Sequence, residues 1–130
     1  MSAAFDVATK LVALGYGTLG SNLGVNAFID SGDNEIAVFE YPGTPDLTTH
    51  SGVAFEYPNV QVQVRHTIAQ TAFQKCYDIY AALRDLKDQT INAHIYQYFE
   101  PKMLPTKLDI DEQLRTTWMC ELKLHRTPEA

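Results

Sequence analysis

A strictly alternating stretch in the middle of the chain places the strongest constraint on the fold. Residues 58–66 read PNVQVQVRH, so Val60, Val62 and Val64 share one side of an extended strand while the residues between them take the other side. A period of two indicates a β-strand and excludes a helix over this stretch. We therefore expect the valines to lie in the core and the polar side chains between them to face water.

The strand is followed at once by the longest helical pattern in the chain. Thr67 with Gln70 three residues later matches a capping box, which predicts a helix over about residues 68–87. Its apolar stripe consists of Ala69, Ala72, Phe73, Cys76, Ile79, Tyr80, Leu83 and Leu86. We expect this helix to cover one face of the sheet and to bury the three valines.

The first third of the chain combines both periodicities. A helix is expected at residues 2–14, with Gly15 ending it in a left-handed conformation. Strands are expected at residues 23–29 and 35–41, and the turn at residues 31–34 indicates that they pair as a hairpin.

Two more strands and two long connections complete the chain. The strands are expected at residues 91–99, with Ile91, Ala93, Ile95 and Phe99 on one face, and at residues 114–126, with Leu114, Trp118, Cys120, Leu122 and Leu124 on one face. Residues 42–58 and 100–113 contain prolines and lack sustained periodicity, so they are predicted to be long loops, with residues 53–57 extended inside the first. Loops of this length usually flex or contact a partner.

This order of elements predicts an α+β domain. The sheet is expected to be mostly antiparallel, with about five strands and with two helices packed on one face. A chain of 130 residues has the size of a single domain, here residues 1–130, with a flexible polar tail from about residue 127.

Charge and composition exclude several classes of protein. The formal net charge of −6 argues against a reader of DNA or RNA, which needs clustered lysines and arginines. No apolar run approaches the ~20 residues of a membrane span, and the N-terminal segment lacks the basic leader of a signal peptide. Cys76 and Cys120 fall in core-facing patterns without CxxC spacing, so buried free thiols are favoured over a disulfide.

The motifs of known enzyme classes find little support. Residues 15–20 read GYGTLG, a literal GxGxxG, but a predicted helix precedes it and a predicted strand follows it, the reverse of a dinucleotide-binding unit. A turn that ends the helix is therefore favoured over a cofactor site. No serine or cysteine lies in a nucleophile elbow, so we expect neither catalysis nor a cofactor.

Metal binding is not expected either. The four histidines, His50, His66, His94 and His125, are scattered without ligand spacing. Residues 109–112 read DIDE but lack the central glycine and the terminal glutamate of a calcium-binding loop. A solvated acidic turn is favoured there, with an intersubunit contact as the alternative.

Polar rows remain as the candidate functional surface. They lie on the wet side of two predicted strands and consist of Gln61, Gln63 and Arg65, then Arg115, Thr117, Glu121 and Lys123. Taken alone, such rows are more often a solvated sheet face than a binding surface.

The alternating strand that runs directly into a long helix resembles the minor capsid and tail terminator proteins of tailed bacteriophages. In that family a Pro-x-Val-Gln-Val-x-Val-Arg strand runs into a helix that ends in Leu, and a later Asp-Glu-x-x-Arg leads into the last strand. The matching residues are Pro58, Val60, Gln61, Val62, Val64, Arg65, Leu83, Asp111, Glu112 and Arg115. The chain departs from the family pattern at Leu114, where a small turn residue is expected, and at Gly24, where a bulky apolar residue is expected.

The resemblance implies a non-enzymatic virion protein at the head–tail junction, assembled in the host cytoplasm. Such proteins form a homo-oligomeric ring, commonly a hexamer, which ends polymerisation of the major tail tube protein and presents a surface to the head completion or connector protein. Genomic DNA passes through the lumen without specific binding, and no membrane is involved. The candidate interaction residues are Gln61, Gln63, Arg65, Asp111, Glu112 and Arg115.

Two alternatives stay open at this point. One is another head–tail connector or neck completion protein of similar fold, which differs in whether it binds the tube or the connector first. The other belongs to a different class: a small-ligand-binding or enzymatic α+β domain that uses the turn at residues 15–20 or the histidines. Stabilisation by nucleotides or divalent metals in a thermal-shift screen would favour the second alternative.

Overall fold

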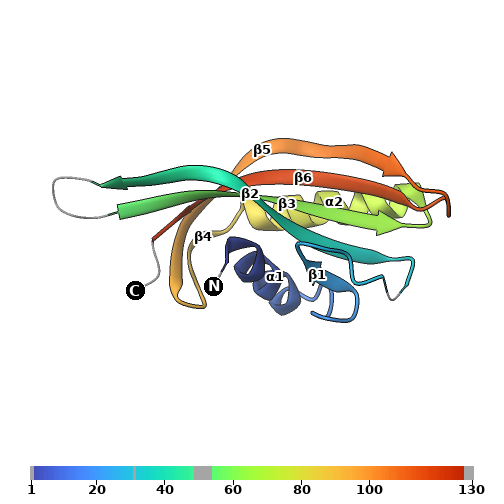
Figure 1. Cartoon of the computed structure of the whole chain (residues 1–130), viewed down its shortest axis with the longest axis horizontal. Coiled ribbons are helices and arrows are strands. Elements are labelled where there is room, and N and C mark those ends of the chain that lie inside the picture. The colour runs from blue at the N-terminus through green and yellow to red at the C-terminus, as the bar shows by residue number, and fades with distance from the viewer. Residues whose placement is uncertain (1, 31, 49–53, 128–130) are drawn as a thin grey trace.

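The protein folds as a curled six-stranded sheet that packs two helices against one face (Figure 1). The computed structural model describes residues 2–30, 32–48 and 54–127. The elements are α1 (Ala3–Ala13), β1 (Leu23–Val25), β2 (Glu35–Thr48), β3 (Ala54–His66), α2 (Ala69–Arg84), β4 (Lys87–Ile91), β5 (His94–Ile110) and β6 (Thr116–Arg126). The predicted α+β class is confirmed, with six strands in place of about five.

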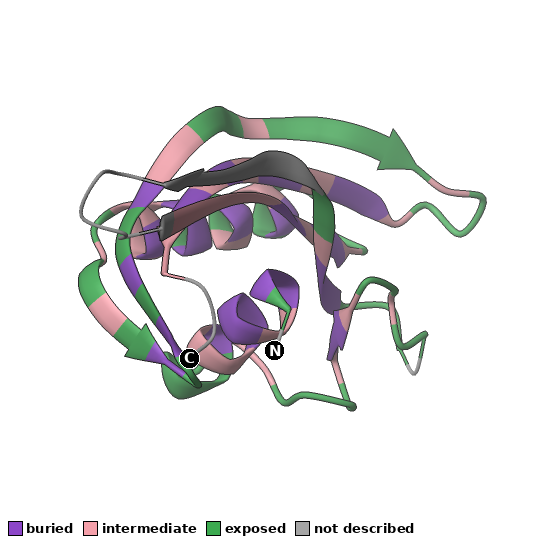
Figure 2. Cartoon of the chain, turned by 60° about the vertical axis from the view of Figure 1, so that its left-hand side comes forward, coloured by how far each residue is buried: buried purple, intermediate pink, exposed green. Residues whose placement is uncertain are grey.

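The strand order is β1-β2-β3-β6-β5-β4, and every pair is antiparallel except β1 with β2. β3 lies inside the sheet, between β2 and β6. Its alternating valines, Val60, Val62 and Val64, are at most 1% exposed and belong to the same core cluster as Cys76 and Ile79 of α2. The prediction that the period of two reflects burial of the valines against the helix is confirmed. Figure 2 shows the helices within the curve of the sheet.

The predicted hairpin between residues 23–29 and 35–41 is wrong. β1 ends at Val25 and pairs parallel with β2, with Leu23 opposite Ile36. The chain turns sharply after β1, where Asn26 is left-handed (φ 60°). The turn brings the carbonyl oxygen of Ala27 so close to Gly24 that a Cβ atom there would lie 2.1 Å from it, so only glycine fits. The segment that follows crosses over the sheet before β2 begins, so the two strands run in the same direction.

The two predicted long loops are largely strands. β2 and β3 continue to Thr48 and from Ala54 as a hairpin arm that extends past the helices (Figure 1). Residues 49–53, including the start of the predicted extended segment, lie outside the described residues. β5 likewise runs to Ile110 through residues predicted to be a loop. Prolines misled the prediction, because edge strands tolerate them. Residues 42–48 of β2 and 101–110 of β5 lack a second neighbouring strand in the described part of the chain.

The predicted strand at residues 91–99 is instead the end of β4, a tight turn and the start of β5. Asn92 is left-handed (φ 55°), and Ile91 pairs directly with His94 across the turn. The turn shifts the alternation by one residue, so His94 and Tyr96 are buried while Ile95 is 48% exposed. A register shift between Tyr96 and Tyr98 then returns Phe99 to the buried face, as predicted. The predicted face that included Ala93 and Ile95 is therefore wrong.

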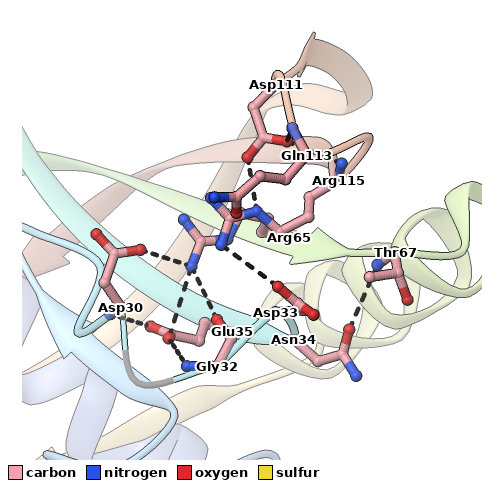
Figure 3. Close-up of polar contacts among 10 residues, drawn as sticks. All are labelled: Asp30, Gly32, Asp33, Asn34, Glu35, Arg65, Thr67, Asp111, Gln113 and Arg115. Carbon is pink, nitrogen blue, oxygen red and sulfur yellow. Dashed lines mark hydrogen bonds and ion pairs between the residues drawn. The ribbon is translucent and has the colours of Figure 1, made fainter.

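The start and end of α2 differ from the prediction. Its N-cap is Ile68, which makes no side-chain capping hydrogen bond, and the helix ends at Arg84. Thr67 does not cap the helix; its N–H donates to Oδ1 of Asn34, 3.3 Å away (Figure 3). Packing of its apolar face against the sheet stabilises the helix, and no capping box contributes.

A buried polar contact joins α1 to the sheet. Asp6 is fully buried and accepts hydrogen bonds from the Tyr96 hydroxyl and from Nδ2 of Asn92. Nη1 of Arg126 lies 3.7 Å from Oδ2 of Asp6, and Nε of Arg126 donates to Oε2 of Glu56 at 2.8 Å. Burial, followed by the hydrogen bond to Asp6, raises the pKa of Tyr96, so the phenol stays protonated and remains a donor.

The two cysteines are free and buried, as predicted. The contact with Cys76 and burial together raise the pKa of the Cys120 thiol well above its usual value, so the neutral thiol packs as a small apolar group.

Tyr96→Phe is expected to lower the free energy of unfolding by about 1–3 kcal/mol, because it removes a hydrogen bond from a carboxylate that has no access to water. Urea denaturation measures the loss. Tyr98→Phe on the same strand is the matched control, since Tyr98 is 38% exposed and loses only a hydroxyl near solvent. Equal stabilities for the two variants would contradict a stabilising role for the Tyr96–Asp6 contact.

Candidate interaction surface at one end of the sheet

Arg65 is the last residue of β3 that points away from the valines. The sequence places it on a wet face, but the structure leaves it only 7% exposed because the segment between β1 and β2 folds over it. Nη2 of Arg65 donates to Oδ1 of Asp30 at 2.8 Å and to the carbonyl oxygen of Gly32 at 3.2 Å. The guanidinium carbon also lies 4.5 Å from the ring centre of Phe28, a cation–π contact.

Glu35 forms the other half of this buried pair. It opens β2 directly opposite Arg65 in the sheet, and its Oε2 lies 3.6 Å from Nη2 of Arg65. The carboxylate also accepts the backbone N–H groups of Asp30 at 2.9 Å and Gly32 at 3.0 Å. Glu35 and Arg65 therefore bind the segment between β1 and β2, through the backbone of Asp30 and Gly32 and the side chain of Asp30. A buried carboxylate is tolerated here because it is both paired and hydrogen-bonded.

The turn between β5 and β6 is organised by Asp111. Oδ1 of Asp111 accepts the backbone N–H groups of Gln113 at 3.0 Å and Arg115 at 2.9 Å, and Oδ2 accepts Nε of Arg115 at 2.6 Å. The backbone hydrogen bond from Arg115 is the main reason that the pKa of Asp111 is lowered. The acidic turn thus has a defined shape.

The two arrangements meet at the same end of the sheet (Figure 3). Nη1 of Arg115 lies 3.7 Å from Oδ1 of Asp33, which links the β5–β6 turn to the segment that covers Arg65. An open, polar pocket between them is lined by Asp30, Gly32, Asp33, Gln113 and Arg115. The described residues contain no group of three or more side chains suited to hold a metal ion.

Half of the six candidate residues come together here, namely Arg65, Asp111 and Arg115. Glu112 lies in the same turn and is exposed, beside a second shallow pocket. The glutamines lie farther along β3: Oε1 of Gln61 accepts the Tyr41 hydroxyl at 3.0 Å and Nε2 of Gln63 at 2.7 Å. Gln61 is 7% exposed, so the expected wet face is only partly wet.

Sequence reasoning missed the partners that bury Arg65. They are Phe28, Asp30 and Glu35, with Asp33 beside Arg115. Pairing the predicted strand at residues 35–41 antiparallel with the alternating strand would have placed Glu35 opposite Arg65. No local pattern indicated that residues 26–34 cross the outer face.

Leu114 is an unexpected feature of the β5–β6 turn. The sequence places it on the buried face of the last strand, but it lies before β6 and is 74% exposed. It is also left-handed (φ 60°), a conformation that costs a residue with a side chain about 1–2 kcal/mol relative to glycine. A large apolar side chain in water at a strained position is typical of a contact residue.

The remaining motifs have structural roles in the described part of the chain. Gly15 and Gly20 are left-handed (φ 86° and 83°), and the N–H of Gly15 donates to the carbonyl oxygen of Val12 at 3.0 Å. The GxGxxG stretch therefore ends α1, as predicted. Among the helices that the structure describes, none is long and apolar enough to cross a membrane.

Comparisons with known proteins agree with this fold. A chain in the structure titled "Virion of native gene transfer agent (GTA) particle" superposes with a TM-score of 0.63 at 10% identity, covering 84% of this chain and 81% of that chain. At this identity the match shows a shared fold alone. No curated protein sequence matches the chain.

The sequence itself carries the assignment. Residues 10–128 match the family model described as bacteriophage tail terminator protein, which covers most of the chain. Members of this family are structural and non-enzymatic, and they associate with other tail proteins in the virion. The chain therefore belongs to the bacteriophage tail terminator family and is a structural component of the virion, not an enzyme.

Proposed function

We propose that this protein forms a ring of identical copies, a hexamer as the family resemblance implies, that caps the head-proximal end of the tail tube. The ring stops polymerisation of the tube protein and joins the completed tail to the head connector. The observation that carries this proposal is the family match over residues 10–128. Those residues include the end of α1, the whole of α2 and all six strands.

The shape of the molecule supports a protein with two different partners. β5 has 17 residues, which corresponds to a length on the order of 50 Å. The β2–β3 arm extends past the helices at one end, whereas the β5–β6 turn lies at the other (Figure 1). The cluster around Arg65 adjoins this turn through the contact between Arg115 and Asp33 (Figure 3). A cap between a tube and a connector needs separate surfaces at its two ends.

The cluster around Arg65 supports a prearranged surface at the second end. Glu35 and Arg65 fix the segment at residues 26–34, and Asp111 fixes the β5–β6 turn. Segments that are already ordered lose less conformational entropy when a partner binds. A formal charge of −6 also suits a lumen through which DNA passes, because acidic walls repel phosphates.

Tails assembled without this protein are expected to carry tubes of irregular and excessive length that fail to join heads. Electron microscopy gives the tube lengths and the fraction of joined particles. Purified protein added to such an assembly should restore a narrow length distribution, and the ring itself should be visible at the tube end. Uniform tubes that join heads in its absence would overturn the proposal.

Arg65 and Arg115 are expected to respond differently to charge reversal. Arg65→Glu would place a third carboxylate beside Asp30 and Glu35 in a buried site, so the free energy of unfolding should fall by about 3–5 kcal/mol. Arg115→Glu should cost about 1 kcal/mol or less, because Arg115 is less buried than Arg65 and neither of its acidic partners is fully buried as Glu35 is, with Asp33 at 61% and Asp111 at 29% exposed.

Urea denaturation of the two variants measures these losses, and tail joining is then compared at equal folded concentration. Reduced joining by folded Arg115→Glu would assign the turn to a partner interface, while normal joining would remove Arg115 from it. Equal stability of Arg65→Glu and the unmodified protein would contradict the buried pair.

Leu114→Gly is expected to maintain or raise stability by about 1 kcal/mol, because glycine adopts the left-handed conformation without strain. If the exposed leucine contacts the head or tube partner, the same variant should join fewer tails. Thermal unfolding and joined-particle counts separate the two effects. Asp88→Gly, at an exposed left-handed residue of β4 (φ 52°), is the control. Full joining by Leu114→Gly would exclude a contact role for this side chain.

A further inference from the structure

Each outer edge of the sheet is covered along only part of its length. β1 pairs with β2 at Ile36 to Val38, and β4 pairs with β5 only between His94 and Tyr98. Among the described strands, none pairs with the outer side of residues 101–110 of β5, which we call the free half of β5. Figure 2 shows this stretch exposed.

The free half of β5 is apolar yet poorly suited to add another strand. Its exposed large side chains are Met103 (40%), Leu104 (65%), Leu108 (50%) and Ile110 (48%). Pro101 and Pro105 lie within it, and its pairing with β6 shifts register three times after Pro101. Prolines and bulges of this kind prevent a second chain from extending the hydrogen-bonded ladder. A partner would therefore contact the side chains of this stretch and not its backbone.

The charges of the two sides of the sheet are complementary. Residues 101–108 read PKMLPTKL, with two lysines and no acid. Lys102 and Lys107 are exposed, and neither makes an ion pair with any residue that the structure describes. On the α1–β1–β2 side, Glu40 of β2 is an acid that makes no ion pair with any residue that the structure describes, whereas Asp30, Asp33, Glu35 and Glu56 are paired with arginines elsewhere.

Apolar side chains accompany the acidic side as well. Glu40 is exposed on β2, two residues beyond the last residue that pairs with β1. Val12, Leu14, Leu19 and Ile29, on α1 and the segments that flank β1, are each 39–41% exposed. Figure 1 shows α1 and β1 in the lower part of the view and the free half of β5 along the top, whereas β5 begins near α1, where Tyr96 contacts Asp6. The two sides thus offer different, matching surfaces, which is what head-to-tail contacts in a closed ring require.

The sheet register also puts the two surfaces at the same level. Pro101 pairs with Leu122, Leu122 with Val60, and Val60 with Glu40. These four paired residues form one row across the sheet, with Glu40 at its β2 end. Lys102 directly follows Pro101, the residue at the β5 end of the row. In a ring whose axis runs roughly along the strands, rotation brings equal levels of neighbouring copies together.

We propose that the free half of β5 of one copy docks against the α1–β1–β2 side of the next copy, with Lys102 facing Glu40. This inference rests on the proposed ring and names its subunit contact. The apolar side chains of the two surfaces are buried on assembly, and the lysine–glutamate pair sets the level and the direction of the contact.

Charge swapping tests this contact. Lys102→Glu and Glu40→Lys are each expected to raise the protein concentration needed for ring formation by about tenfold or more, because like charges then face each other. A mixture of the two variants, and the chain that carries both changes, should assemble as the unmodified protein does. Lys87→Glu on β4 is the control, since it changes the same charge outside the free half of β5.

Sedimentation velocity follows ring formation of the protein alone, and electron microscopy follows it on isolated tail tubes. Oε1 of Glu40 accepts the N–H of Ala4 at 3.0 Å, so Glu40→Gln provides a variant that keeps this acceptor while removing the charge. It should weaken assembly less than Glu40→Lys does and keep the unmodified melting temperature.

The outcomes separate the contact from the ring. If the unmodified protein forms rings and the single variants form them equally well, or if mixing does not restore assembly, this contact is wrong while the ring stands. If the unmodified protein forms no ring, alone or on tubes, the proposed function fails first.

Discussion

β3 runs between β2 and β6 along most of its length, and its two faces have different partners. The valines on one face meet the apolar side of α2, which fixes the helices on the concave side of the sheet. Arg65 on the other face pairs with Glu35 and holds the segment from β1 to β2 across the outer surface. Both contacts depend on the same alternation, because a register shift of one residue would exchange a valine with an arginine. The placement of every other element follows from this strand.

The charged end of the sheet shows how a polar cluster can be structural and still prepare a binding surface. Glu35 and Arg65 are almost completely buried, so their contribution is to order the crossing segment. Arg115 and Leu114 are nearer to solvent and belong to a turn whose backbone Asp111 holds. The same end therefore combines buried, ordered residues with an exposed turn, and this turn is the part that the proposed function assigns to a partner.

The edges of the sheet explain why the candidate interface was only partly predictable. Alternation gives Gln61, Gln63 and Arg65 a common face, and they share it in the structure. Alternation cannot show that residues 26–34 cover Arg65, since that contact joins segments about 35 positions apart. The apolar free half of β5 was hidden by Pro101 and Pro105, which read as loop residues although an edge strand accepts them. The segment at residues 26–34 and the free half of β5 both lack a regular hydrophobic period, so the sequence did not reveal their roles at the surface.

The sequence by itself determined the central strand, the long helix after it, the buried valines, the free thiols and the resemblance to tail terminators. These features depend on periodicity, which records how side chains divide between core and water along a single element. Only the tertiary structure decided that β1 runs parallel to β2, that the two proline-containing stretches are long strands, and that Arg65 is buried. Those outcomes depend on which distant segment covers a given face or edge, and that choice is made by the packing of the whole chain.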